Sequence, residues 1–297
     1  MQYKWLSAYI FYSGPAEVCL RGFIKPFAEK VRPQLHPLAP YFFIRYGEGG
    51  PHIRFRLQTS EAHLANLQIM LEDEVHMFSD MWGVVKNVSD REIVLSPDND
   101  CIKFVQYIPE TSRYGNPDTL MLAERQFFLS SQYSLQRISQ PSWDISTALA
   151  VAFQMHIAFF YALQADISTI RNICEHFIGS WLASLTVQMK DVSLTVLLDH
   201  MNELYARQSD LLNRRAIDLW KALEAGSASA DLQEFAYDNR SILEEYQASG
   251  LPEKQFHSVL RSLLHMTHNR LGISNKEEPW CIYVTQRCLL YIYESIS

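Results

Sequence analysis

The spacing of hydrophobic residues changes near residue 117, and this change limits the folds open to the chain. Before it, short runs rich in aromatic and β-branched residues alternate with amphipathic segments, as when strands and helices take turns. After it, the spacing is helical almost to the last residue. We therefore predict an α+β fold, with a mixed subdomain over residues 1–116 and a helical subdomain over residues 117–297.

The first part of the chain is predicted to follow the order β-α-β-β-α-β. Its four strands are short and alternate in hydrophobicity; they are expected over residues 3–12, 41–46, 52–57 and 84–88. Its two helices are expected over residues 16–31 and 60–77. This order is typical of a ferredoxin-like head.

The second part is predicted to be a helical body. Its helices are expected over residues 117–137, 143–164, 166–190, 192–224, 229–248, 252–272 and 280–297. The most apolar stretch, residues 148–163, is interrupted by Gln154 and His156 and is shorter than the roughly 20 residues that span a bilayer. We interpret it as a buried helix and expect no membrane insertion.

The composition excludes several classes of protein. Hydrophobic residues make up 48% and charged residues 20%, which is ordinary for a globular protein. A net charge of −7 argues against direct binding of nucleic acid through many phosphates. The five cysteines are odd in number and widely spaced, which predicts neither a disulfide framework nor a zinc site and fits the reducing cytoplasm.

A cationic row lies on the strand expected over residues 52–57. Because side chains alternate between the faces of a strand, His52, Arg54 and Arg56 should share one face, with apolar residues on the other. One interpretation is the solvated outer face of a half-buried sheet. The other is an anion site, since arginine binds carboxylates through two parallel hydrogen bonds.

A turn-rich segment, residues 107–117, joins the two parts and contains Arg113 and Tyr114. One interpretation is a structural elbow, in which Glu110 pairs with Arg113 and Gly115 supplies a positive φ angle. The other is functional, because binding residues often gather on such joints. In that case Arg113 joins the cationic row.

A third group lies near the C-terminus, where His265 and His268 sit on the more polar side of an amphipathic helix. No H-E-x-x-H motif or third ligand accompanies them, so we predict no metal site. A proton-transfer group and a structural histidine remain the two interpretations. Dinucleotide-binding, P-loop and serine-hydrolase motifs are absent from the sequence.

These three groups, read in order, resemble the C-terminal elimination domain of lantibiotic dehydratases, also called the thiopeptide-type bacteriocin biosynthesis domain. The resemblance rests on YFFIRYGEGGPHIRFRL, YIPETSRYGN with AERQFF, and LLHMTHNRLGI, and runs from Trp5 to nearly the last residue. The middle motif departs from the family, which has a second glycine where this chain has Asn116. The two predicted subdomains would then form one elimination domain.

The resemblance implies removal of glutamate from O-glutamylated serine or threonine in a ribosomally made precursor peptide. In the family, elimination needs residues that match Arg54, Arg56, Arg113 and His265 here. We expect the arginines to bind the carboxylate and the developing oxyanion, and His265 to act as acid or base. His52, His268 and Tyr114 are expected to bind or position the substrate.

The same resemblance implies partners. A separate protein would glutamylate the precursor peptide from glutamyl-tRNA, no cofactor is needed, and a homodimer is left open. Two other functions stay open: a thiopeptide pyridine synthase, which joins two dehydroalanines in a formal cycloaddition, and a non-catalytic module that binds the precursor peptide.

Overall fold

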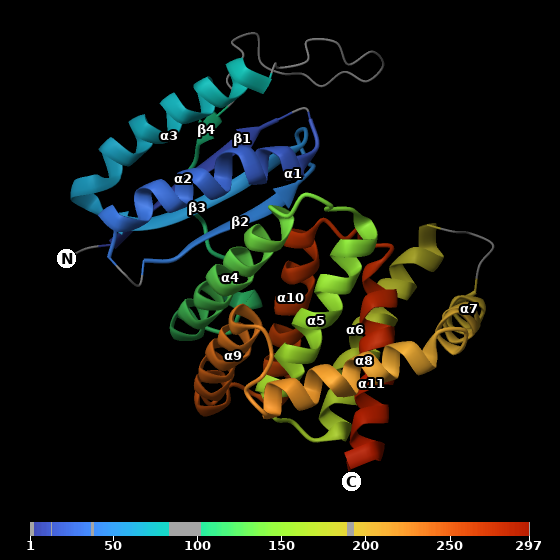
Figure 1. The fold of residues 1–297 in the computed structure, drawn as a ribbon. Coiled ribbons are helices and arrows are strands. Elements are labelled where there is room, and N and C mark those ends of the chain that lie inside the picture. The colour runs from blue at the N-terminus through green and yellow to red at the C-terminus, as the bar shows by residue number, and fades with distance from the viewer. Residues whose placement is uncertain (1–2, 13, 37–38, 83–101, 189–192, 297) are drawn as a thin grey trace. The chain divides into compact units, whose positions relative to one another are not determined.

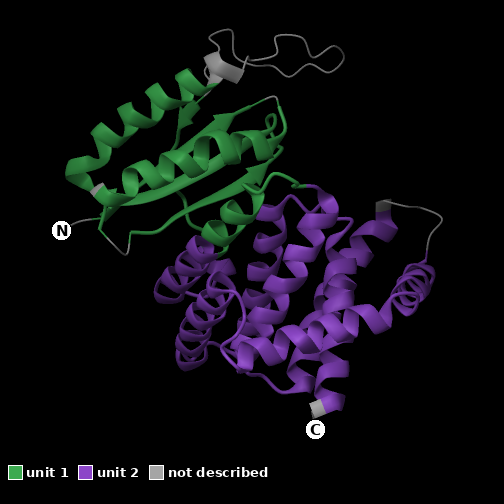
Figure 2. Cartoon of the chain, viewed as in Figure 1, with its two compact units in different colours: residues 1–110, 130–143 green, residues 111–129, 144–297 purple. Residues whose placement is uncertain are grey.

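The computed structural model describes residues 3–12, 14–36, 39–82, 102–188 and 193–296 (Figure 1). The chain has an α+β fold, as predicted. It divides into two compact units, coloured separately in Figure 2. Unit 1 consists of residues 1–110 and 130–143, and unit 2 of residues 111–129 and 144–297. The expected division between residues 116 and 117 stays a prediction.

Unit 1 contains a four-stranded sheet. Its strands are β1 (Tyr3–Phe11), β2 (Tyr41–Tyr46), β3 (His52–Ser60) and β4 (Ile102–Phe104). They lie in the order β2-β3-β1-β4, and each pair of neighbours is antiparallel. The strand expected over residues 84–88 lies outside the described residues.

Helices pack on the apolar face of this sheet. A continuous helical stretch consists of α1 (Ala16–Cys19), the π-helical η1 (Leu20–Ile24) and α2 (Lys25–Val31), and is followed by the 3₁₀ turn η2 (Arg32–Gln34). The other helix is α3 (Glu61–Trp82), which contacts β1 and β3. Phe55 of β3 is 0% exposed and meets the ring of Phe27 edge-on at 6.0 Å. Burial of such large rings stabilises the sheet and helices as one layered core.

Where the structure describes the chain after residue 116, it is mainly helical, as predicted. Its helices are α4 (Pro117–Ile138), α5 (Ile145–Leu163), α6 (Ile167–Gln188), α7 (Leu194–Ala206), α8 (Ser209–Glu224), α9 (Ala230–Ala248), α10 (Glu253–Leu271) and α11 (Glu278–Ile296). Helix α5 is long and apolar enough to cross a membrane by composition alone. It instead packs against α8, α9, α10 and α11, so the prediction of a buried helix is confirmed.

One predicted helix is wrong in its extent. The single helix expected over residues 192–224 is two helices, α7 and α8, which separate at Arg207 and Gln208. The backbone of Gln208 leaves the helical region, with φ −134° and ψ 9°. The Tyr205 hydroxyl donates to Asn213 Oδ1 at 2.6 Å across the break. Neither glycine nor proline marks this position, so the sequence carries no local signal for it.

Candidate functional site

The arginine face of β3, formed by His52, Arg54 and Arg56, lies opposite the apolar face as predicted. Residues Ile53, Phe55 and Leu57 are buried in the core of unit 1. The arginine face is not a solvated outer surface, however. His52 is 5% and Arg56 8% exposed, although arginine is a residue type that is mostly exposed.

Aromatic rings hold the Arg54 guanidinium. It lies 3.2 Å from the ring centre of Tyr46 and 4.7 Å from that of Tyr9, which come from the strands on either side of β3. Cation–π contacts stabilise the charge without using the N–H donors that a carboxylate would bind. The Arg54 Nε donates to His52 Nε2 at 3.3 Å, and this bond fixes the rotation of the guanidinium plane.

Arg56 is held in the same way and is more deeply buried. Its guanidinium lies 4.6 Å from the ring centre of Tyr107 and 5.5 Å from that of Phe42. Its Nε is buried without a hydrogen-bond partner. Desolvation lowers the pKa of Arg56, with the Arg54 charge acting in the same direction and Tyr107, Tyr9 and Glu110 opposing it. Among the described residues, neither Arg54 nor Arg56 forms an ion pair, so both charges remain available to an anion.

His52 connects the turn before β3 to Arg54. Its Nδ1 donates to the carbonyl of Gly50 at 2.8 Å, so its Nε2 carries the lone pair that accepts from Arg54. Its ring stacks on Tyr9 with 4.9 Å between centroids. Burial lowers the pKa of His52 and Arg54 adds to the effect, whereas the bond to Gly50 opposes it. The imidazole therefore acts as a neutral support for Arg54.

In unit 2, the 3₁₀ turn η3 (Thr111–Arg113) presents Arg113, which is exposed. The Arg113 Nε donates to Ser262 Oγ at 3.2 Å. Ser262 lies three residues before His265 on α10, and residues at this spacing share a helix face. The structure therefore places Arg113 and His265 in one neighbourhood of unit 2, although 149 residues separate Arg113 from Ser262 in sequence.

The residues after Arg113 fix the direction of the chain. Gly115 has a φ of +108°, and a Cβ atom there would lie 2.9 Å from Leu251 and clash with Thr119. Asn116, the departure from the family motif, accepts from the backbone N–H groups of Asp118 and Thr119 at 2.9 and 3.0 Å. It caps the N-terminus of α4, a role for which asparagine is well suited. Tyr114 is 4% exposed and packs edge-on against Phe127.

A buried carboxylate joins His265 to His268. His265 Nδ1 lies 2.9 Å from Glu278 Oε1, and His268 Nδ1 lies 3.1 Å from Glu278 Oε2. Glu278 is 0% exposed in the first turn of α11. Desolvation favours its protonated form, but hydrogen bonds from both histidines outweigh it and lower the pKa of the carboxyl. Glu278 is therefore a carboxylate that accepts from both imidazoles.

His265 is the member of this group that reaches solvent. Its side chain is 22% exposed and lies against Trp181 of α6, with 5.3 Å between ring centroids. Because a carboxylate accepts only, the Nδ1 of His265 carries the proton. In the neutral ring, Nε2 then carries the lone pair. This is the arrangement of a histidine that takes up a proton at Nε2 while a carboxylate stabilises the resulting imidazolium.

Other candidate sites are weaker. Within the described residues, no group of three histidine, cysteine or acidic side chains could hold a metal ion. Burial raises the pKa of the thiols of Cys19 and Cys288 to about 12, and of Cys174 and Cys281 further, which disfavours thiolate chemistry there. Cys101 lies outside the described part of the chain.

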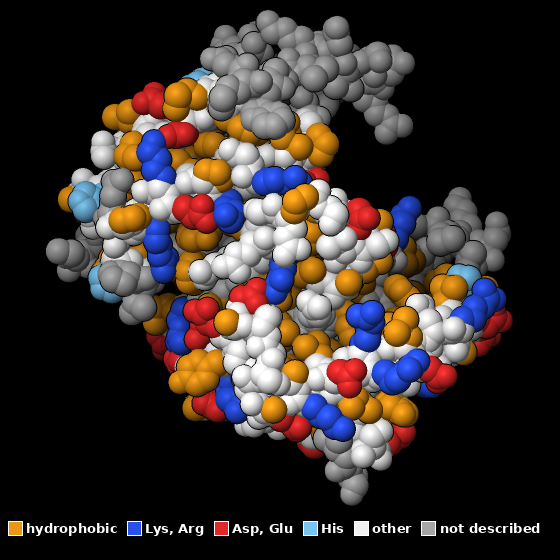
Figure 3. Space-filling model, viewed as in Figure 1, with side chains coloured by type: hydrophobic (Ala, Val, Ile, Leu, Met, Phe, Trp, Pro, Cys, Tyr) orange, Lys and Arg blue, Asp and Glu red, His pale blue; other side chains and the backbone are white. Residues whose placement is uncertain are grey.

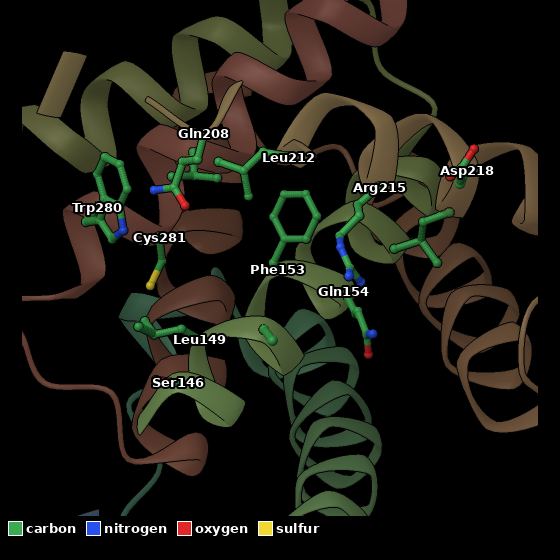
Figure 4. Close-up of a pocket in the computed structure, with 13 residues that line it drawn as sticks. Ser146, Leu149, Phe153, Gln154, Gln208, Leu212, Arg215, Asp218, Trp280 and Cys281 are labelled. Carbon is green, nitrogen blue, oxygen red and sulfur yellow. The ribbon is translucent and has the colours of Figure 1, made fainter. Parts of the chain in front are cut away.

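A cavity of about 820 Å³ opens in unit 2 between α5, α8 and α11 (Figure 4). Phe153 lies in its middle, with Trp280 and Cys281 on one side and Arg215 and Asp218 on the other. Its lining is Ser146, Leu149, Ala150, Phe153, Gln154, Gln208, Leu212, Arg215, Asp218, Leu219, Trp280, Cys281 and Val284. None of the residues expected from the sequence to carry chemistry lines it, so it is separate from the candidate site.

The molecular surface in Figure 3 shows acidic and basic side chains interspersed over the visible face of unit 2. They do not gather there into a continuous basic patch.

The family model described as "Lantibiotic biosynthesis dehydratase C-term" matches residues 5–289. The chain belongs to this family. Membership supports a role in the biosynthesis of ribosomally made, modified peptides, and the resemblance recognised in the sequence is confirmed. A search of the curated proteins finds no match.

Three solved structures share the fold. The pyridine synthase TbtD from thiomuracin biosynthesis has a TM-score of 0.75 and 15% identity, over 99% of this chain and 100% of that one. The tRNA-dependent lantibiotic dehydratase MibB from Microbispora sp. 107891 has a TM-score of 0.67 and 18% identity, over 99% of this chain and 28% of that one. TsrL has a TM-score of 0.61 and 15% identity, over 99% and 96%. At sequence identities this low, the likeness shows a shared fold alone.

Sequence reasoning missed several residues of the site. Glu278 was not singled out, although it is an acidic residue two positions before the helix predicted over residues 280–297. Tyr9, Tyr46 and Tyr107 read as ordinary strand and loop aromatics. The contacts of Tyr9 and Tyr46 with Arg54 depend on which strands neighbour β3 in the sheet. The strand order cannot be derived from the local sequence, so these contacts could not be predicted.

Proposed function

We propose that this protein eliminates glutamate from O-glutamylated serine and threonine residues of a ribosomally made precursor peptide. The products are dehydroalanine and dehydrobutyrine. The observation that carries the proposal is the arginine face, where two guanidinium groups are held by aromatic rings and neither makes an ion pair among the described residues. A glutamyl ester formed from glutamyl-tRNA is joined through the α-carboxyl and keeps a free side-chain carboxylate, a group that a guanidinium binds through two parallel hydrogen bonds.

The reaction is a β-elimination. The Cα–H bond of the esterified residue breaks and its electrons form the Cα=Cβ double bond, while the Cβ–O bond breaks and glutamate leaves as a carboxylate. Negative charge develops on the peptide carbonyl and on the departing ester oxygen. Fixed guanidinium groups stabilise such charge without reorganisation, and we assign this role to Arg54, Arg56 and Arg113.

We assign proton transfer to His265. The neutral imidazole offers the lone pair of Nε2, and Glu278 stabilises the imidazolium that forms when the Cα proton arrives. The same imidazolium can then protonate the departing group. His52 supports Arg54, and Tyr114 and His268 lie beside Arg113 and Glu278 respectively.

The proposed reaction requires a second protein and a cellular compartment in which it takes place. We propose that a separate enzyme attaches glutamate from glutamyl-tRNA to the precursor peptide, and that the elimination takes place in the cytoplasm. The mechanism uses amino-acid side chains alone and draws on no cofactor. We also propose that the head of unit 1 is ferredoxin-like, supported by the antiparallel strand order β2-β3-β1-β4.

A pyridine synthase is the second candidate, favoured by the likeness to TbtD along the full length of both chains. One experiment separates the two. The purified protein is incubated with a glutamylated precursor peptide, and free glutamate and peptide mass are followed. The proposal expects one glutamic acid to be lost at each ester. An intact ester, together with ring formation from a separately dehydrated peptide, would favour the pyridine synthase; binding without either reaction would favour a peptide-binding module.

A further inference from the structure

The inference rests on the proposed function, in which His265 moves a proton. We propose that His268 is a positioning residue that holds the Glu278 carboxylate against His265. It would act through Glu278, because its own side chain is 0% exposed and lies within unit 2.

The surroundings of His268 determine which of its nitrogens carries a proton. Its Nδ1 lies 3.1 Å from Glu278 Oε2, which can only accept. Its Nε2 is buried without a hydrogen-bond partner. Protonation of Nε2 would bury an unpaired charged donor, which is costly. The ring is therefore neutral, with its single proton on Nδ1.

His156 reinforces this state. Its ring meets that of His268 edge-on, with 4.8 Å between centroids. The hydroxyl of Thr285 donates to the carbonyl of Cys281 at 2.9 Å, so at the 3.0 Å contact between Thr285 and His156 the oxygen accepts and His156 Nδ1 donates. The ring of Phe177 also meets that of His268 edge-on, with 5.8 Å between centroids. These two uncharged rings pack against His268, and neither is a hydrogen-bond partner of its Nε2.

The two histidines that contact Glu278 therefore differ in the protonation states open to them. Both imidazoles donate to the carboxylate, but the buried one is fixed as a neutral donor. Of the two imidazoles, His265, whose side chain is 22% exposed, is therefore the one that a proton from substrate or solvent can reach. Titratable or charged groups from three elements lie around His265 in the described residues. Glu278 comes from α11, and His268 and Arg261 lie on α10 itself. Arg113 of η3 donates to Ser262 of α10, and α6 contributes the uncharged indole of Trp181.

The experiment follows the imidazole of His265 by NMR in protein labelled at histidine, with the signal assigned by its loss in His265→Gln. Replacing His268 with phenylalanine keeps the ring and removes the donor. The carboxylate then has one donor, its charge is concentrated on His265, and the titration midpoint of His265 should rise by about half a pH unit or more. The His268→Asn variant, whose amide N–H can stand near the position of Nδ1, should return the midpoint to the wild-type value.

A double-mutant cycle tests the route through the carboxylate. In a Glu278→Gln background, His268→Phe should leave the midpoint of His265 unchanged, since the group that connects the two rings has lost its charge. Circular dichroism and thermal melting check that each variant is folded; His268→Leu replaces the phenylalanine variant if that one does not fold. An unchanged midpoint in a folded His268→Phe variant overturns the proposal, as does an asparagine variant that behaves like phenylalanine.

The pH profile of glutamate release gives the second readout. In His268→Phe, the limb that reports the free base of His265 should move in the same direction as the NMR midpoint. The NMR result does not depend on turnover, so the two hypotheses fail separately. A wild-type protein that releases no glutamate but shows the expected midpoints sinks the proposed function alone. Normal glutamate release with unchanged midpoints sinks the role of His268 alone.

Discussion

Glu278 Oε1 lies 2.9 Å from Nδ1 of His265, so a carboxylate buried in the first turn of α11 sets the tautomer of a partly exposed histidine on α10. The two residues are 13 positions apart and are joined by the loop that follows Gly272. In the proposed elimination this pair is the proton-transfer device, and it supplies the first of five predictions.

The Glu278→Gln variant should lower kcat for glutamate release by roughly 10²-fold, the range in which a positioned acid–base pair contributes. The amide cannot balance the imidazolium, although it fills the same space. Steady-state kinetics with a glutamylated peptide measure the effect. The control is Glu245→Gln, an exposed residue that pairs with Arg125 on the surface of unit 2. Equal kcat in both variants would remove Glu278 from the mechanism.

Arg54→Lys and Arg56→Lys should each lower kcat/KM by about 10²-fold or more. Lysine keeps the positive charge but loses the planar fork and the stacking on Tyr46 or Tyr107. Arg125→Lys, a change to an exposed arginine elsewhere, should leave kcat/KM within about twofold of wild type. If lysine supports full activity on β3, charge alone is sufficient there and binding of a carboxylate by two parallel bonds is the wrong interpretation.

His52→Phe should reduce kcat/KM by about tenfold, less than either arginine variant. The ring still stacks on Tyr9, but the acceptor for Arg54 Nε is gone and the guanidinium can turn. The kcat/KM for glutamate release of an Arg54→Ala variant, measured in the same assay, provides the reference point. A loss as large as that of Arg54→Ala would mean that His52 contacts the reacting groups itself.

The stability of the protein should fall as the pH drops from about 7 to 5, in part through His156. Burial holds the pKa of this histidine well below its ordinary value in the folded chain. The unfolded chain binds a proton near pH ~6.5 and the folded chain does not, so the contribution is complete above that pH and is lost below it. His52 and His257, whose pKa values are also lowered by burial, act in the same direction.

Urea unfolding at several pH values measures this slope. One such histidine contributes at most about 1.4 kcal/mol per pH unit. His156→Phe should flatten the slope, because Thr285 keeps its bond to the carbonyl of Cys281 and no proton uptake remains at residue 156. The exposed His200→Phe is the matched control and should leave the slope as in wild type. An identical slope in His156→Phe would mean that residue 156 does not titrate differently on folding.

Gly115→Ala should destabilise the protein by more than Gly226→Ala. Both glycines have positive φ angles, +108° and +66°, which cost an alanine about 1–2 kcal/mol. At Gly115 the added Cβ also meets Leu251 at 2.9 Å and Thr119, whereas at Gly226 nothing lies within 4 Å. Thermal and chemical unfolding compare the two. Equal losses would show that packing around residue 115 relaxes freely.

Much of the arginine face could be predicted because strand alternation is a local property. The two-residue period puts His52, Arg54 and Arg56 on one side whatever the partners of the strand are. The surroundings of the arginine face could not be predicted from the neighbouring residues in the sequence. The aromatic contacts of Arg54 come from Tyr9 and Tyr46, which belong to the neighbouring strands and reach Arg54 because of the strand order in the sheet.

The histidine group shows the same limit on the helical side. The spacing of α10 predicts that His265 and His268 lie on neighbouring positions of one helix. It does not predict that one is 0% exposed and the other partly open, since helix packing decides which positions are covered. The break between α7 and α8 was also not predicted, because neither glycine nor proline marks it in the sequence.

The sequence by itself determined the α+β class, most element positions, the shared face of His52, Arg54 and Arg56, and the family, because periodicity and short motifs are written in neighbouring residues. The tertiary structure alone decided that aromatic rings hold the arginines and that Glu278 holds His265. These contacts join residues from different strands and helices. Their geometry follows from packing and from the desolvation of charges, which exist once the chain has folded.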